Sequence, residues 1–226
     1  MKEKAIVLLS GGMDSAVCLG IAKEQGFEPA ALHLNYGQRT QTKELKCFED
    51  LCNHYGVNLR LIVDVNHLSK IGGSSLTEFA IDVKEDSVES SNENSVPDSY
   101  VPFRNANILA IAVSWAEAID AKAIFIGASQ VDFSGYPDCR EEFFDAFQKV
   151  INTGTKPETN IQIMTPILNY TKSQIVQKGL EINVPLEYTW SCYQGEEEAC
   201  GKCDSCALRL KGFSEAGSKD KIKYKA

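Results

Sequence analysis

A glycine-containing loop near the N-terminus has the composition of a phosphate-binding site. Residues 10–15 read Ser-Gly-Gly-Met-Asp-Ser and follow a short apolar run at residues 5–9. The two glycines let successive backbone N–H groups form a concave nest for an anion, and the start of a following helix favours negative charge. The loop contains no lysine, so it is not a Walker A sequence and would hold the pyrophosphate of a nucleotide differently. Asp14 could hold Mg²⁺ or cap the helix.

A second chemical feature is a cluster of four cysteines near the C-terminus, with the spacing C-x7-C-x2-C-x2-C: Cys192, Cys200, Cys203 and Cys206. This spacing lets four thiolates converge on one ion, which is typical of structural Zn²⁺. The rival is an iron–sulfur cluster, but the ferredoxin run continues C-x3-C-P, whereas Ala-Leu-Arg-Leu follows Cys206 here. We therefore predict one structural zinc per chain. The other four cysteines are expected to be small buried apolar residues: Cys18, Cys47, Cys52 and Cys139.

The elements that must position these residues alternate between strand and helix. Buried-strand patterns occur at residues 4–9, 29–34, 58–65, 123–127 and 161–164. Helical periodicity occurs at residues 14–25, 38–54, 105–119 and 138–152, and a further helix begins at Thr171. The sequences Asp138-x-x-Glu141 and Thr171-x-x-Gln174 predict capping boxes. This alternation predicts a doubly wound, five-stranded, mostly parallel sheet with helices on both faces. Residues 1–185 would form this nucleotide-binding α/β domain, and residues 186–226 a zinc-binding segment packed on it.

An acidic segment interrupts the alternation. The chain of 226 residues has a formal net charge of −8, and residues 82–98 contribute six acidic residues and one basic residue to it. This segment is poor in large apolar residues, so we expect a long mobile loop, either a lid or a solvated insertion without a role. We find no apolar stretch long enough to span a membrane and no signal-peptide pattern, so we expect a cytoplasmic protein without a membrane partner.

Several motifs together resemble known enzyme families. The SGGxDS pattern is the signature of the PP-loop ATP pyrophosphatases, which cleave ATP between the α and β phosphates to adenylate a substrate. The sequences NYGQR at residues 35–39 and SGYPDCR at residues 134–140, with the cysteine spacing, resemble the 7-cyano-7-deazaguanine synthase family over nearly the whole chain. The chain departs from that family at Phe103, where many members have glycine, and in its longer acidic insertion.

The resemblance implies an activity and a set of partners. The activity is that of a ligase that forms C–N bonds, converting 7-carboxy-7-deazaguanine, ammonia and ATP with Mg²⁺ into 7-cyano-7-deazaguanine (preQ0) for queuosine biosynthesis. An adenylated carboxylate and an amide would be its intermediates. The resemblance also implies a HUP-type sheet and a homodimer.

The resemblance also implies site residues. The phosphate loop and the following helix would bind ATP: Leu9, Ser10, Gly11, Gly12, Met13, Asp14, Ser15, Ala16, Val17, Cys18 and Leu19. The catalytic candidates are Asp14, Lys172, Arg104 and Arg140. The candidates for binding the deazaguanine acid are Tyr36, Gln38, Arg39, Asp132, Tyr136 and Asp138. Several of these candidates have an alternative role. Lys172 could be a solvated helix lysine, the arginines could form surface ion pairs, and Asp138 could cap a helix.

Two other functions fit parts of the sequence. A PP-loop enzyme that thiolates tRNA would share the phosphate loop, but an acidic chain without a long basic stretch does not favour a nucleic-acid partner. Because most of the negative charge lies in residues 82–98, net charge alone excludes tRNA only weakly. A non-enzymatic nucleotide-binding module with a zinc knuckle would leave the other polar motifs without a role.

Overall fold

Five short apolar segments form one fully parallel sheet in the computed structural model, which describes residues 2–85, 96–131 and 135–225. The strand order is β3-β2-β1-β4-β5. The strands are β1 (Lys4–Leu8), β2 (Glu28–Asn35), β3 (Arg60–Asp64), β4 (Ala121–Phe125) and β5 (Gln162–Met164). All four strand pairs are parallel, which confirms the predicted fold class.

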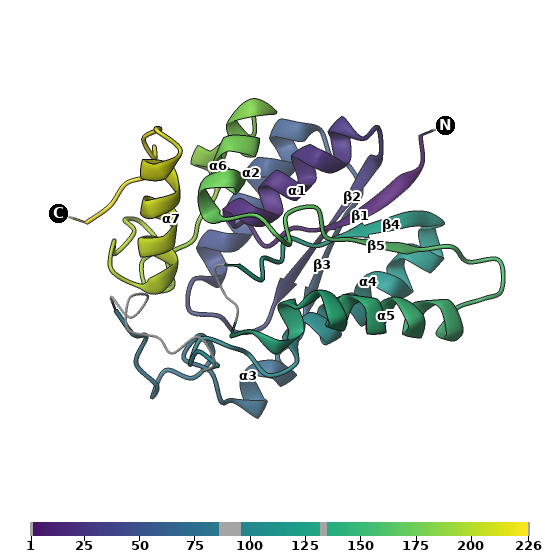
Figure 1. The fold of residues 1–226 in the computed structure, drawn as a ribbon. Coiled ribbons are helices and arrows are strands. Elements are labelled where there is room, and N and C mark those ends of the chain that lie inside the picture. Colours follow the sequence, from purple (N-terminus) through teal and green to yellow (C-terminus); the bar gives the residue numbers. More distant parts are fainter. Residues whose placement is uncertain (1, 86–95, 132–134, 226) are drawn as a thin grey trace.

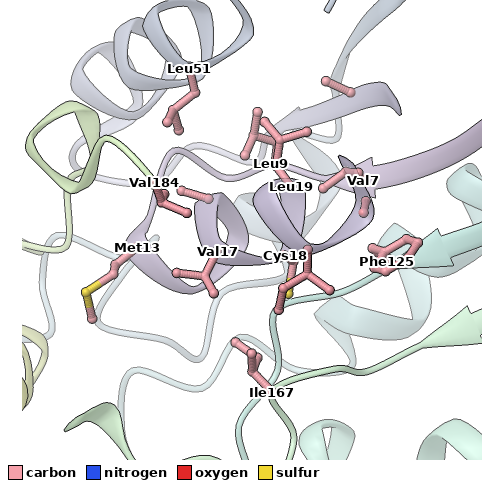
Figure 2. Close-up of a cluster of buried hydrophobic side chains, with 14 of the residues drawn as sticks. Val7, Leu9, Met13, Val17, Cys18, Leu19, Leu51, Phe125, Ile167 and Val184 are labelled. Atoms are coloured by element: carbon pink, nitrogen blue, oxygen red, sulfur yellow. The ribbon is translucent and has the colours of Figure 1, made fainter. Parts of the chain in front are cut away.

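Helices cover both faces of this sheet (Figure 1). The helices α1 (Met13–Glu24), α2 (Gln41–Tyr55) and α6 (Lys172–Glu181) lie on one face, and α4 (Arg104–Ile119) and α5 (Glu141–Gly154) lie on the other. Because successive strand residues point to opposite faces, Val7 packs with the first group of helices and Ile6 with the second. Figure 2 shows part of the first core, where α1 contributes Val17 and Leu19.

The remaining described elements are short helices and a C-terminal helix. The α3 helix (His67–Ile71) follows β3, and 3₁₀ turns occupy Pro137–Cys139 and Leu186–Tyr188. The α7 helix (Asp204–Glu215) packs against α6. Neither α3 nor α7 was predicted from the sequence. No described helix combines the length and apolar character that a membrane crossing requires.

One predicted cap is confirmed and the other is wrong. At the start of α6, the Gln174 N–H donates to Thr171 Oγ1 (3.3 Å) and the Thr171 N–H donates to Gln174 Oε1 (2.9 Å), as a capping box requires. The α5 helix, in contrast, begins at Glu141 without a side-chain cap. Asp138 instead accepts a hydrogen bond from the Asn105 N–H (2.9 Å) and so caps α4 from a distant part of the chain. The local pattern identified a capping residue but assigned it to the wrong helix.

The described ends of the acidic segment lie beside the C-terminal segment. Lys84 forms an ion pair with Asp98 (2.7 Å), and Glu85 forms an isolated antiparallel bridge with Cys203. The predicted mobile loop covers residues 82–98, and residues 86–95 of it lie outside the described residues. The contact at Cys203 places one end of the insertion next to the cysteine cluster.

Candidate functional site

Close backbone packing holds the loop between β1 and α1 in place. Gly11 has a φ of 87°, and a Cβ atom there would lie 2.5 Å from the Glu44 carbonyl oxygen of α2. A Cβ at Gly127, just after β4, would lie 2.8 Å from the Ser15 nitrogen. A side chain at either position would collide with the backbone of a neighbouring segment, so only glycine fits there. Within the loop, the Gly12 N–H donates to Ser10 Oγ (3.2 Å) and Ser15 Oγ donates to the Gly12 carbonyl (2.9 Å). The loop is thus preorganised at the start of α1, where backbone N–H groups favour an anion.

An ion pair joins this loop to α6. Lys172 Nζ lies 2.8 Å from Asp14 Oδ2, and the lysine side chain is only 10% exposed. Lys172 is in the first turn of α6, whose capping box fixes the helix start. The alternative of a solvated helix lysine is excluded by this burial. A lysine and an aspartate at a nucleotide loop can neutralise phosphate charge and hold a divalent cation, respectively.

A cavity of about 270 Å³ opens beside the loop, at the carboxyl ends of the strands. The strand order reverses between β1 and β4, and such a switch point is where open α/β sheets bind ligands. One wall is apolar and includes Leu34, Ile108 and Ile126. The other walls carry polar groups from the β2–α2 connection, from the start of α4 and from the C-terminal segment. The cavity therefore combines a phosphate site with space for a second polar group.

A cation faces this cavity from α4. Arg104 Nη1 donates to the Tyr36 hydroxyl (3.0 Å), and its guanidinium lies 5.3 Å from the centroid of the Tyr36 ring. Burial raises the pKa of Tyr36 to about 12, so the phenol stays neutral. Tyr136, on the same cavity wall, shares a hydrogen bond of 2.7 Å with Ser99. Arg104 forms no ion pair with any carboxylate in the described part of the chain, so its charge is available to an anionic ligand.

The other predicted polar residues have different environments. Arg39 reaches the cavity wall, but its guanidinium donates to the Ser75 and Ile81 carbonyls (both 2.8 Å) and lies 4.6 Å from the centroid of the Phe79 ring. Arg140 is exposed and lies 3.7 Å from Glu142. Arg140 and Asp138 are not part of the cavity wall, and Asp132 lies outside the described residues. Of the predicted substrate contacts, the cavity brings together Tyr36, Gln38, Arg39 and Tyr136.

The four clustered cysteines form a compact site that could hold a metal ion. Their sulfur atoms all lie within 4.8 Å of one another. Cys200 Sγ and Cys206 Sγ are 3.9 Å apart, close to the roughly 3.8 Å expected between thiolates in a tetrahedral zinc site. Cys192 Sγ accepts hydrogen bonds from three backbone N–H groups, which favours the thiolate form. The remaining four cysteines are buried, as predicted, and none of them belongs to this group of converging sulfur atoms, although Cys47 packs in the same apolar cluster as Cys192, Cys203 and Cys206. Burial raises the pKa of Cys139 to about 11, so its thiol is not an activated nucleophile.

Several residues of the cavity wall were not predicted, among them Glu44, Trp190 and Arg209. The backbone N–H of Trp190 donates to the Gly11 carbonyl (2.9 Å) and so joins the C-terminal segment to the phosphate loop. Arg209 is 1% exposed and donates to both carboxylate oxygens of Asp220 (2.6 and 3.1 Å). These residues stand outside any recognisable motif, and only their three-dimensional neighbours give them a role. Glu44 has one local signal, since it follows NYGQR by five positions.

Comparison with known proteins decides the family. The family model described as "Queuosine biosynthesis protein QueC" matches residues 4–217. The chain belongs to the QueC family. Among curated QueC relatives, the 7-cyano-7-deazaguanine synthase of Chlorobium phaeobacteroides (strain DSM 266) is 56% identical over 98% of this chain and 96% of its own length. The synthase of Aliarcobacter butzleri is 53% identical over 99% and 96%, respectively.

Solved structures with lower identity share the QueC fold. A 4-thiouridine synthetase in complex with RNA and ATP has a TM-score of 0.53 at 21% identity, over 98% of this chain and 47% of its own. The NMN synthetase of Francisella tularensis has a TM-score of 0.51 at 16% identity, over 97% and 79%. These similarities confirm the sheet architecture. They do not identify the substrate, which has to be inferred from the residues of the site.

Proposed function

We propose that this protein is a 7-cyano-7-deazaguanine synthase that uses ATP and ammonia to convert 7-carboxy-7-deazaguanine into the nitrile. One cavity supports this assignment, because a preorganised phosphate loop and Arg104, which has no carboxylate partner in the described part of the chain, face the same space. The curated relatives at 53–56% identity carry this enzyme name, which supports the same assignment here.

The chemistry explains why both groups are needed. A carboxylate is a poor electrophile because its leaving group would be oxide or hydroxide. Attack of the carboxylate on the α-phosphate releases pyrophosphate and gives an acyl adenylate, and ammonia then displaces AMP to form an amide. A second adenylation, at the amide oxygen, allows loss of AMP and protons to give the nitrile. Such a scheme depends on alignment and charge neutralisation rather than on a covalent nucleophile.

Each part of the cavity has a role in this scheme. The loop from Ser10 to Ser15 holds the departing pyrophosphate through backbone N–H groups and hydroxyls. Lys172 neutralises phosphate charge, and Asp14 holds the Mg²⁺ that accompanies ATP. Arg104 pairs with the substrate carboxylate, while Tyr36 and Tyr136 flank the heterocycle. Arg140 and Asp138 stand outside the cavity wall, and the proposal does not use them.

We further propose that the four cysteines bind one structural zinc ion and that residues 186–226 form a zinc-binding segment on the α/β domain of residues 1–185. Four thiolates in a closed site are a common structural zinc solution. The resemblance also supports a homodimer, and light scattering on the purified protein measures that oligomeric state.

The test is nucleotide analysis with alternative substrates. We expect AMP and pyrophosphate to form only when 7-carboxy-7-deazaguanine is present, and Asp14→Ala to abolish their formation while the protein stays folded. ATP cleavage that depends on bulk tRNA instead would support a tRNA-modifying enzyme. ATP binding without cleavage of either kind would support a non-enzymatic module.

A further inference from the structure

Two described residues of the cavity wall carry carboxylates, Asp14 and Glu44. Asp14 is neutralised by Lys172 at 2.8 Å. Glu44 forms no ion pair with any cation among residues 2–85, 96–131 and 135–225. A carboxylate on a cavity wall without a cationic partner is costly unless a ligand or hydrogen bonds compensate it. Glu44 therefore needs an explanation that the phosphate chemistry does not supply.

The neighbours of Glu44 fix the direction of its hydrogen bonds. The Tyr36 N–H donates to Gln38 Oε1 (2.9 Å), so the amide of Gln38 must present its NH₂ group on the other side. That group donates to Glu44 Oε2 (3.1 Å), and Thr40 Oγ1 donates to Glu44 Oε1 (2.8 Å). Both partners are neutral donors, and each carboxylate oxygen keeps a free lone pair. Glu44 is thus held as a rigid pair of acceptors.

The backbone of Glu44 is fixed as firmly as its side chain. Its carbonyl oxygen packs on Gly11, so the first turn of α2 has a set position relative to the phosphate loop. Burial raises the pKa of the Glu44 carboxyl above its usual range, and the hydrogen bonds from Thr40 and Gln38 and the charge of Arg104 offset only part of this rise. A fixed acceptor pair and the Arg104 guanidinium, which has no carboxylate partner among the described residues, match a ligand that has two adjacent N–H donors at one edge and a carboxylate at another.

We propose that Glu44 reads the N1–H and 2-amino edge of the 7-deazaguanine ring and so selects a guanine-type substrate. This inference rests on the proposed function, because that reaction supplies a heterocycle with this donor pair and a carboxylate for Arg104. Two charge-assisted hydrogen bonds to one carboxylate recognise the donor pair. A ring without the 2-amino group leaves one acceptor of Glu44 unpaired. Sites built on such hydrogen bonds strongly reject an analogue that lacks the donor group.

The test compares two acids on two proteins: 7-carboxy-7-deazaguanine and its analogue without the 2-amino group, 7-carboxy-7-deazahypoxanthine. We expect the unmodified enzyme to prefer the first acid by a factor on the order of 10³ in kcat/KM. E44Q keeps the shape but replaces one acceptor with a donor, so kcat/KM for the first acid falls about 100-fold and for the second less than about threefold. The preference then falls from about 10³-fold to roughly 10- to 30-fold. E49Q is the matched control on the exposed face of α2, and it keeps the full preference.

The outcomes separate this inference from the proposed function. If the unmodified enzyme converts neither acid, the proposed function fails. If it converts 7-carboxy-7-deazaguanine and E44Q slows both acids equally, or raises only the KM for ammonium or ATP, Glu44 has another role and the inference is overturned. Should E44Q not fold, Thr40→Val removes one support of the carboxylate, and we expect the preference to fall about tenfold. An unchanged preference in that variant also overturns the inference.

Discussion

At the scale of single residues, the candidate site is built from pairs that are distant in sequence. Asp14 and Lys172 are 158 positions apart and meet at 2.8 Å beside the phosphate loop. Both could be predicted, because each stands at a recognisable helix start. Glu44 and Arg209 could not, because a lone acid in a helix and an arginine after the last cysteine are ordinary surface residues in a one-dimensional pattern. Burial and partners, which only the fold supplies, give them their roles.

Lys172 gives a direct test at this scale. We expect Lys172→Met to lower kcat/KM by a factor of about 10² to 10³, since it removes the buried positive charge beside the loop that we propose binds the phosphates. Steady-state kinetics with ATP as the varied substrate measures the loss. Lys178→Met is the control, because Lys178 lies on the same helix but pairs with surface carboxylates. An effect of less than threefold at Lys172 would contradict its role.

The departure at Phe103 gives a second test. Phe103 has a φ of 56°, a left-handed conformation that glycine adopts without cost and other residues adopt at about 1 kcal/mol. We expect Phe103→Gly to raise the free energy of unfolding by about 1 kcal/mol, and Phe103→Ala to bring no such gain because alanine keeps the strain. Urea denaturation compares the two variants. Equal stability of the two variants would contradict the backbone strain at this position, because both lack the ring that contacts Phe143 and differ only in the freedom of the backbone.

At the scale of elements, the α/β alternation was predictable and the C-terminal segment was not. Strand and helix periods in the first 180 residues reflect two-sided burial in a parallel sheet, so pattern alone locates those elements. The α7 helix begins within the cysteine cluster, since Cys206 lies in its first turn, and its packing on α6 comes from long-range contacts. Asp138 illustrates the same limit, since the start of α4 that it caps lies 33 positions earlier in the sequence.

The ion pair of Arg209 and Asp220 tests how α7 is held. Burial raises the pKa of Asp220, but hydrogen bonds and the charge of Arg209 outweigh it and lower the pKa below its usual value. The stability from this carboxylate is therefore present above about pH 4, the pKa of an unfolded aspartate, and is lost as the pH falls through the lower folded pKa.

We expect Asp220→Asn to lower the free energy of unfolding by about 3 kcal/mol at neutral pH, because it leaves a buried arginine without its counter-charge. The difference between variant and unmodified protein should shrink below about pH 4. Chemical denaturation at several pH values measures that difference. Glu215→Gln, at an exposed pair on α7, should change stability by less than about 0.5 kcal/mol. A loss of the same size in both variants would contradict the role of Asp220.

At the scale of the whole molecule, the C-terminal segment connects the cysteine cluster to the cavity. The segment that carries Cys192 also carries Trp190, whose N–H donates to the carbonyl of Gly11 in the phosphate loop. Metal analysis should therefore give about one zinc per chain, and removal of zinc by a chelator should lower the melting temperature and abolish turnover together. Iron with labile sulfide, or full activity after the metal is removed, would contradict this link.

The central claim is that one cavity activates a carboxylate with ATP and delivers ammonia to it. The most direct measurement incubates the protein with ATP, Mg²⁺, 7-carboxy-7-deazaguanine and ¹⁵N-ammonium, and analyses the products by mass spectrometry. We expect an amide and then a nitrile, each carrying one ¹⁵N atom, and neither product without ATP. Folded, metal-loaded protein that yields neither labelled product would contradict the proposed reaction.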